Sequence, residues 1–253
     1  DSSAMFENAR RVLLLIAALV VGSLLLLAIP DAELTAVAAR LSLRPQARVV
    51  LHTAGGLDAS VLAPLGKRSA VGSFHPLKAF PHPWLDPAEA SGAFFAVDGD
   101  PVAQQLARRL ADAWEGVTAE LAPASRPLYH LAASLAAGGV VTLLALVADL
   151  ASRSALPAEV LAGFAELTRG AVEAALQADD PARALTGPVV RGDHETVERH
   201  LAALARAAPD RVALVTQLAR ETLLQAQRVG SLLPAQAGLA RRLAVAAPRQ
   251  GDR

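Results

Sequence analysis

The sequence has no cysteine. This absence excludes a disulfide framework, a thiolate nucleophile and any cysteine-bound metal or iron–sulfur cluster. It also fits a reducing compartment, so we expect a cytoplasmic protein. Aromatic residues are scarce too, at 4% of 253 residues, although 53% of the chain is hydrophobic. The apolar content is therefore mostly Ala, Leu and Val, which favours helices and packing through small side chains.

An excess of positive charge is also missing, because 24 basic residues are balanced by 24 acidic ones without a basic block. Binding to phosphates needs a concentrated cationic face, so nucleic acid is not expected as the main partner. The sequence contains no G-x-S-x-G elbow, P-loop or H-E-x-x-H motif. His194 and His200 lie six residues apart, on different faces of one helix, so we expect no metal site.

The G-x-G-x-x-G fingerprint of dinucleotide sites is absent as well, since none of the 17 glycines stands in a G-x-G pair. A Rossmann sheet normally carries that loop after its first strand. Two explanations stay open. Either the first strands lie upstream of Asp1, or residues 1–22 have replaced them.

Two long apolar runs, Val12–Ile29 and Leu131–Ala148, each contain 18 uncharged residues. Both just reach the length of a membrane span, and the first also resembles a signal-peptide core. Pro30 and Asp31 after the first run predict a helix with Asp31 as its N-cap, which favours a buried strand and a strand-to-helix turn. For the second run we expect a buried helix at the centre of the C-terminal domain and at a two-fold dimer interface.

Up to residue 121 the sequence alternates short apolar runs with helical patterns, which is typical of a mainly parallel α/β sheet. After the proline-containing stretch near residue 123 it predicts long helices and no strand. We therefore expect a Rossmann-like domain over residues 1–123 and an all-helical substrate and dimerisation domain over 124–253. The predicted strands are 24–29, 48–53, 69–74, 93–99 and 117–121. The predicted helices of the second half are 127–152, 158–179, 193–207, 210–229 and 235–246.

Polar clusters lie at the ends of several predicted elements, and five of the six histidines fall in or beside them. Turn chemistry alone selects Gly, Pro and Asp, so each cluster by itself has a purely structural explanation. Together they are more simply explained by one shared site. The clusters are His52-Thr53-Ala54-Gly55-Gly56, residues 72–77, Tyr129-His130 and residues 185–193.

These segments resemble the bacterial Rossmann-like oxidoreductases that carry a C-terminal helical domain of unknown function. The resemblance covers residues 24–205. It is carried by LLLLAIPDAEL (24–34), VVLHTAGGL (49–57), VGSFHPLKAF (71–80), the Tyr129-His130 helix start and LTGPVVRGDHETVERHL (185–201). Such proteins are similar in plan to pyrroline carboxylate reductase, 6-phosphogluconate dehydrogenase and ketopantoate reductase. This chain departs from the family in lacking the glycine-rich start and in having Gly138 where many members carry Asn.

The resemblance implies a fold and an activity. The fold is an α/β Rossmann-like domain with a parallel sheet, followed by an all-α domain of the 6-phosphogluconate dehydrogenase C-terminal type. The activity is NAD(P)H-dependent reduction of a small 2-keto acid, with a ketopantoate-like substrate favoured. We expect NADP or NAD as cofactor, the keto acid as small-molecule partner, and a homodimer.

The same plan implies roles for individual residues. The cofactor lies over the carboxyl ends of the strands, and its ribose and nicotinamide would face Pro30, Asp31, His52, Thr53, Gly55 and Gly56. His130 is the first candidate proton donor and His75 the second. Arg191 would grip the substrate carboxylate with its planar guanidinium. Tyr129 and Asp193 are the other candidate substrate-binding residues. Asp193 has an alternative role as the cap of the following helix, which we favour.

We expect His130, His75 and Arg191 to converge in a cleft between the two domains. Two other functions stay open. One is a non-catalytic nucleotide-binding or interaction protein of the same fold, which the missing glycines support. The other, a minority alternative, is a membrane-anchored protein that uses residues 12–29.

Overall fold

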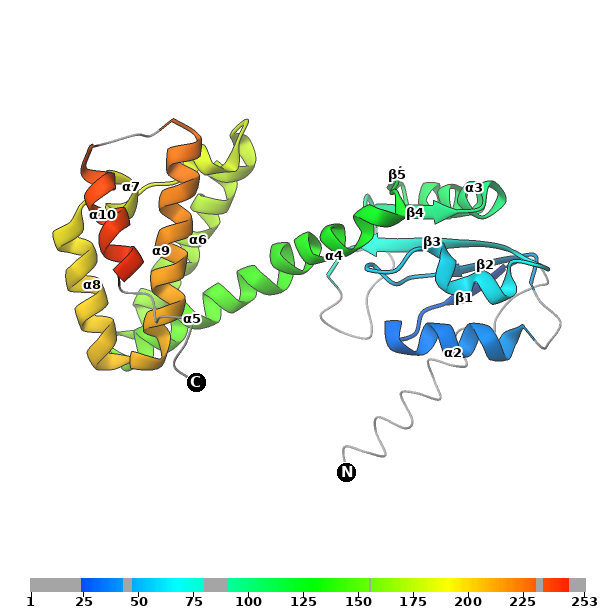
Figure 1. Ribbon diagram of the computed structural model, residues 1–253, viewed down its shortest axis with the longest axis horizontal. Coiled ribbons are helices and arrows are strands. Elements are labelled where there is room, and N and C mark those ends of the chain that lie inside the picture. Colours follow the sequence, from blue (N-terminus) through cyan, green and yellow to red (C-terminus); the bar gives the residue numbers. More distant parts are fainter. Residues whose placement is uncertain (1–23, 43–46, 80–90, 155, 231–233, 246–253) are drawn as a thin grey trace, which may run out of the picture. The chain divides into compact units, whose positions relative to one another are not determined.

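The computed structural model describes residues 24–42, 47–79, 91–154, 156–230 and 234–245, and it divides into two compact units (Figure 1). The first unit comprises residues 1–140 and the second 141–253. Residues 12–23 of the first apolar run lie outside the described residues, and so do residues 80–90.

The first unit contains a five-stranded sheet with the strands in sequential order. Each strand overlaps a predicted one, and three of the four pairings are parallel, so the expected mainly parallel sheet is confirmed. The three parallel pairs are those joined through helical segments, whereas β4 runs back antiparallel along β3. The strands are β1 (Leu24–Leu27), β2 (Val49–His52), β3 (Ala70–Leu77), β4 (Phe94–Gly99) and β5 (Val117–Glu120).

Helices cover both faces of this sheet, with α2 (Asp31–Leu41) on one side and α3 (Pro101–Asp112) on the other (Figure 1). Alternate strand residues point to opposite faces, so each face has its own core. The core under α2 also includes the 3₁₀ segment η1 (Ala59–Leu65). The core under α3 is built on the alanines of that helix and stacked rings of Phe74 and Phe95.

Helices α2 and α3 each begin directly after a strand of the sheet, and α2 begins within one residue of its predicted start. The N-cap of α2 is Pro30, with φ −54° and ψ 140°, and Asp31 is the first helical residue, so the prediction of Asp31 as N-cap was wrong by one residue. A proline is pre-set for this position because its φ is fixed near −65°. Asp100 is the N-cap of α3, and its carboxylate accepts from the backbone N–H of Val71 at 2.7 Å. Asp100 therefore ties the start of α3 to β3.

One continuous helical stretch joins the two halves of the sequence. It consists of α4 (Arg126–Ser134), the π turn η4 (Leu135–Gly139) and α5 (Val140–Arg153), and the turn η3 (Pro123–Ser125) precedes it. The compact units divide at residue 140, later in the chain than the change of pattern near residue 123. The reason is that Arg126 binds α4 to the sheet, as described below.

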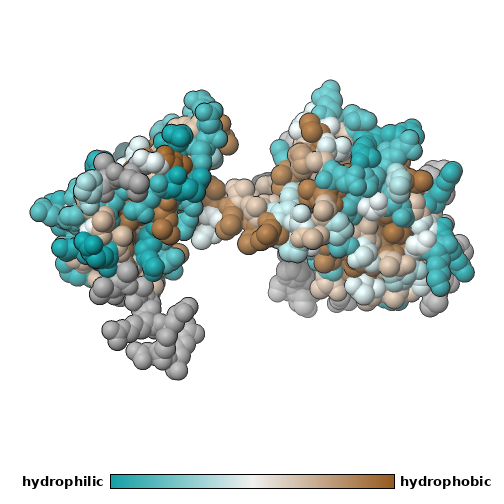
Figure 2. Space-filling model, turned by 45° about the horizontal axis from the view of Figure 1, so that its top comes forward, coloured by the Kyte–Doolittle hydropathy of each residue, from teal (hydrophilic) through white to brown (hydrophobic). Residues whose placement is uncertain are grey.

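The second apolar run is helical as predicted, but the expectation that it is buried within its own chain was wrong. Leu131, Leu135 and Val141 are each more than half exposed. The helix Pro123–Arg153 is long and apolar enough to cross a membrane by length and composition, and none of its most apolar stretch is buried within the chain. Figure 2 shows such apolar side chains at the surface of each unit. An apolar run predicts the need for cover but does not specify which molecule provides it.

The second unit is all-helical in its described residues, and no strand follows residue 126 there, as predicted. Its longer helices match the predicted ranges, whereas the short α7 was not foreseen. The core of this unit is small and centres on Val197, Leu239 and Leu243. Besides most of α5, the helices are α6 (Ala158–Gln177), α7 (Pro188–Arg191), α8 (His194–Ala207), α9 (Val212–Arg228) and α10 (Pro234–Val245), with turns η5 (Pro181–Ala184) and η6 (Pro209–Arg211).

Candidate functional site

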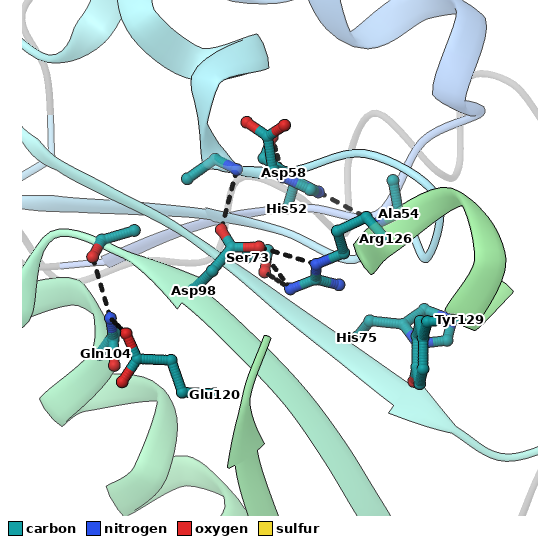
Figure 3. A network of polar contacts seen from close by, with 12 residues as sticks. His52, Ala54, Asp58, Ser73, His75, Asp98, Gln104, Glu120, Arg126 and Tyr129 are labelled. Carbon is teal, nitrogen blue, oxygen red and sulfur yellow. Dashed lines mark hydrogen bonds and ion pairs between the residues drawn. The ribbon is translucent and has the colours of Figure 1, made fainter. Parts of the chain in front are cut away.

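Two histidines and the only tyrosine meet where α4 crosses β3. The Tyr129 hydroxyl lies 2.8 Å from Nδ1 of His75, and the two rings are perpendicular (Figure 3). His130, the next residue on α4, places its ring 5.8 Å from that of His75 between centroids, again edge to face. Two predicted catalytic residues, His75 and His130, are thus neighbours within the first unit.

Gly55 lies where both histidine rings reach the turn after β2. A Cβ atom at Gly55 would lie 2.6 Å from Nε2 of His75 and still closer to Nδ1 of His130. Both histidine rings therefore pack closely against Gly55, which leaves no room for a side chain there. Nδ1 of His130 is buried and has no hydrogen-bond partner in the described part of the chain. A buried nitrogen without a partner is costly, so this atom is a candidate for a contact with a ligand.

A hollow of about 320 Å³ opens beside these rings, and its lining residues all belong to the first unit. This volume is in the range of small-molecule sites. Besides His75 and His130, the polar lining residues are Lys78 and Ser134, which the sequence analysis did not single out. A larger hollow of about 560 Å³ lies next to α3 and the start of β2, with Arg48 and Arg109 in its lining but no histidine.

His52, at the end of β2, holds the turn that carries Gly55. Its side chain is fully buried. Nδ1 accepts from the backbone N–H of Ala54 at 3.2 Å, and Nε2 lies 3.2 Å from the carbonyl oxygen of Asp58 (Figure 3). With Nδ1 accepting, Nε2 donates to that carbonyl and the ring is neutral. Burial also lowers the pKa of His52. His52 therefore acts on the site by shaping the turn from Thr53 onwards.

The electrostatics of the site favour a neutral His75 ring at neutral pH. Burial, the charge of His130 and the charge of Arg126 lower the pKa of His75 from 6.5 to about 4. The carboxylate of Asp31 opposes this shift for both His75 and His52. Burial raises the pKa of the Tyr129 hydroxyl. The His75–Tyr129 pair is therefore a neutral hydrogen-bonded pair, and Asp31 is close enough to influence it.

The remaining predicted cofactor contacts lie at the carboxyl ends of β1 and β2. Pro30 and Asp31 are exposed at the start of α2, directly after β1. Thr53 and Gly56 are partly exposed in the turn after β2, and the Thr53 N–H donates to the Leu27 carbonyl at 3.2 Å. These strand ends share one edge of the sheet, as the sequence analysis expected.

The predicted residues of the last motif lie in the second unit. Gly187 and Gly192 have φ of 100° and 70° and delimit the short helix α7, so the motif needs glycine at both positions. Asp193 caps α8 by accepting from the Thr196 N–H at 3.1 Å, so the favoured capping role is confirmed. Arg191 is exposed at the end of α7. Its convergence with His75 and His130 stays a prediction.

The sequence analysis missed a buried ion pair beside the site. Nε of Arg126 donates to Oδ2 of Asp98 at 2.7 Å, and Nη2 binds the same oxygen and the Ser73 hydroxyl (Figure 3). Oδ1 of Asp98 accepts from the Ala59 N–H at 2.8 Å. One signal was available, because Asp98 falls on the inward face of an otherwise apolar strand. A buried carboxylate requires a cation or several donors.

The family of the chain follows from two matches along the sequence. Residues 8–77 match the model of a Rossmann-like domain, and residues 93–222 match DUF2520, a domain of unknown function. The chain belongs to the DUF2520 family. The recognition of a Rossmann-like family with a helical C-terminal domain is thereby confirmed. No curated protein matches the chain in sequence.

Solved structures support the fold. Protein TM1727 from Thermotoga maritima is 22% identical with a TM-score of 0.66, covering 81% of this chain and 79% of its own. Protein BF3122 from Bacteroides fragilis, assigned as an NADP oxidoreductase, is 21% identical with a TM-score of 0.66, covering 81% and 78%. Plasmodium falciparum pyrroline carboxylate reductase with NADP bound is 12% identical with a TM-score of 0.51, covering 85% and 76%. At these identities the likeness shows the fold alone.

The residues present fit one end of a nicotinamide cofactor, the group that this fold implies. The exposed strand ends at Asp31 and Thr53 and the unpartnered nitrogen of His130 suit the nicotinamide ribose and a reacting oxygen. The described turns after β1 and β2 contain no G-x-G sequence for the pyrophosphate. No group of three or more metal-ligating side chains occurs among the described residues.

Proposed function

We propose that this DUF2520 protein is an NAD(P)H-dependent oxidoreductase that reduces the carbonyl group of a small 2-keto acid, with a ketopantoate-like substrate favoured. The observation that carries the proposal is that the rings of His75 and His130 lie edge to face and line one hollow beside the Gly55 turn. The assignment of one similar structure as an NADP oxidoreductase and the NADP bound in another support the cofactor class.

Bound NADPH or NADH would supply the hydride. Pro30, Asp31, Thr53, Gly55 and Gly56 would hold its ribose and nicotinamide at the carboxyl ends of β1 and β2. Reduction of a carbonyl places negative charge on its oxygen, so the protein has to stabilise this oxygen and protonate it. Two imidazole rings that line one hollow are placed to contact such an oxygen.

The two histidines would divide this work. In its protonated form His130 donates its Nδ1 proton to the oxygen, because its ring lines the hollow and Nδ1 has no partner among the described residues. His75 stays neutral, since its pKa is held at about 4. With the Tyr129 hydroxyl donating to Nδ1, Nε2 of His75 carries the hydrogen and donates a second hydrogen bond to the same oxygen. Solvent returns the proton to His130 after product release.

The substrate carboxylate needs a cation. We assign this role to Arg191, whose planar guanidinium can bind a carboxylate with two hydrogen bonds. Lys78 in the hollow of the first unit is a second cation that a small anion would meet. The exposed Lys78 makes the hollow better suited to an anionic substrate than to a neutral one.

The first experiment measures cofactor binding by titrating the purified full chain with NADPH and with NADH and following their fluorescence. Saturable binding is expected. Oxidation of the bound cofactor is then followed with ketopantoate and with a series of smaller 2-keto acids. A folded chain that binds neither cofactor would contradict the proposal and favour the non-catalytic alternative.

Two variants then separate binding from turnover. His130→Ala should lower kcat about 10²- to 10⁴-fold, the usual contribution of a positioned acid, whereas His200→Ala, an exposed histidine of α8, should not. Arg191→Ala should raise KM for the keto acid about tenfold or more with a smaller effect on kcat. Arg183→Ala, which removes another exposed arginine of the second unit, is its control.

A further inference from the structure

Three polar residues form a row across the sheet beneath the site. His52, Ser73 and Asp98 are register partners on β2, β3 and β4, so their side chains point to the same face. All three are at most 3% exposed. A buried polar row inside an otherwise apolar core is costly unless each group is bound. His52 is satisfied by its own turn, whereas Ser73 and Asp98 depend on Arg126.

Arg126 reaches this row from the first residue of α4. Its side chain is fully buried, and its fork binds both Ser73 and Asp98. Figure 3 shows the guanidinium between Asp98 on one side and the His75–Tyr129 pair on the other. Nη1 is buried and has no partner among the described residues. The bonds to Ser73 and Asp98 account for Nε and Nη2 of this guanidinium, but not for its placement beside the rings.

The spacing along α4 and β3 provides that explanation. Tyr129 and His130 follow Arg126 by three and four residues, one helical turn of about 5.4 Å. His75 follows Ser73 by two residues on the same strand face, a rise of about 6.6 to 6.8 Å. Once Arg126 is fixed on Ser73, the next turn of α4 lies over His75. We propose that Arg126 is the positioning residue that holds Tyr129 and His130 against His75 and Gly55.

The charge of Arg126 acts on the same rings. It lowers the pKa of His75, together with burial and the charge of His130, while Asp31 acts in the opposite direction and His52 adds to the lowering. It also opposes the effect of burial on the Tyr129 hydroxyl. Arg126 therefore positions the His75–Tyr129 pair, and after burial and the charge of His130 it also helps to keep His75 neutral. The inference rests on the proposed function only in taking these rings as the reacting groups.

The test uses two variants that keep the buried row free of an unpaired charge. Arg126→Met combined with Asp98→Asn removes both charges, and the amide oxygen that replaces the carboxylate can still accept from the Ala59 N–H. Ser73→Ala removes one ligand of the fork and is the milder change. Arg108→Gln is the control, because Arg108 binds Gln104 and Glu120 on the other face of the sheet, away from the rings.

The readout is the titration of the His75 ring by NMR, assigned with a His75→Gln variant and measured without cofactor. In the double variant the pKa of His75 should rise from about 4 toward 6.5, and in Ser73→Ala it should move less in the same direction. Arg108→Gln should leave it unchanged. A folded double variant, or failing that a folded Ser73→Ala variant, with an unchanged His75 titration would overturn the inference.

Enzyme assays separate this inference from the proposed function. If the wild type reduces keto acids, both variants should lower kcat, the double variant about tenfold or more, because misplaced reacting groups lose effective concentration. A merely structural pair would lower the melting temperature without moving the titration. If the wild type has no reductase activity but the titration shifts, the positioning role stands and the proposed function fails.

Discussion

His75 and Tyr129 are 54 residues apart in the sequence, yet their side chains share a 2.8 Å hydrogen bond between Nδ1 and the hydroxyl. The bond joins a strand of the sheet to the helix that leaves it. Its two members respond oppositely to burial, because desolvation lowers the pKa of an imidazole and raises that of a phenol. Both shifts can be measured separately, and each supplies a prediction.

Tyr129 is the only tyrosine in the chain, so tyrosinate absorbance reports it alone. Its pKa is raised above 10 by burial, so the folded protein should ionise this tyrosine at higher pH than the protein in denaturant. The comparison is one ultraviolet titration in each state. Equal midpoints in the two states would show that the hydroxyl is not held in the partly buried pair described here.

The lowered pKa of His75 makes stability depend on pH. Between pH 6.5 and about 4 the unfolded chain binds a proton at this ring that the folded chain excludes. The contribution is therefore fully present above pH 6.5 and is lost as the pH falls through this window. Urea unfolding at a series of pH values should show a falling free energy of unfolding on acidification, and His52 adds to the same trend.

A matched pair of variants tests this assignment. His75→Gln should flatten the pH dependence over the window, because the excluded proton site is gone. His200→Gln removes an exposed histidine of α8 and should keep the wild-type slope. Identical slopes in both variants would assign the pH dependence to other groups.

Much of the fold could be predicted because its signals are local. The apolar runs in Phe94–Gly99 and Val49–His52 predict strands at the observed places. The partners of Arg126 could not be predicted, since Asp98 lies 28 and Ser73 53 residues away and their meeting depends on the strand register. Similarly, the apolar residues of 131–148 predict a helix that needs cover, but not a helix exposed on its own chain.

The candidate site shows the same division. Glycines after β2 and histidines at strand ends were visible in the sequence, and His75, His130 and Gly55 do lie together. That His52 is instead a buried turn residue depends on both of its nitrogens finding backbone partners, which no spacing rule specifies. The same holds for Asp193, whose sequence position suits either a cap or a ligand.

Substitutions at Gly55 and Gly56 test whether activity depends on the close packing of the two histidine rings against this turn. A methyl group at Gly55 would overlap Nε2 of His75 and Nδ1 of His130, whereas at Gly56 its nearest neighbour would be Cδ2 of His130 at 3.4 Å. Gly55→Ala should therefore displace both rings and lower kcat about 10²-fold, while Gly56→Ala should lower it only slightly. NADPH oxidation in the presence of keto acid measures both.

Stability measurements complete this comparison. Neither glycine has a positive φ, so no backbone strain is expected in either variant. Gly163→Ala, within α6 and with open space around its Cβ, should raise the free energy of unfolding by about 0.5–1 kcal/mol without changing activity. Equal activity of Gly55→Ala and Gly56→Ala would show that activity does not depend on the packing of His75 and His130 against Gly55.

The exposed apolar residues of the long helix lead to the last prediction, the homodimer. Val141, Leu143 and Leu144 are 65%, 45% and 39% exposed on α5, and Leu167 and Leu176 of α6 are more exposed still. Apolar surface of this extent needs cover from water, and a second copy supplies matching surface by symmetry. Light scattering of the purified protein without detergent should give twice the chain mass.

A charge placed in that surface should separate the copies. Leu143→Asp would bury a carboxylate without a partner, which costs several kcal/mol and raises the dimer dissociation constant more than about 100-fold. Val102→Asp is the control, because Val102 is similarly exposed, at 51%, but belongs to α3 of the first unit. A monomeric wild type, or a Leu143→Asp variant that stays dimeric, would contradict the proposed interface. A wild type that needs detergent and sediments with lipid vesicles would instead favour a membrane as the cover, since the helix Pro123–Arg153 has the length and composition for one.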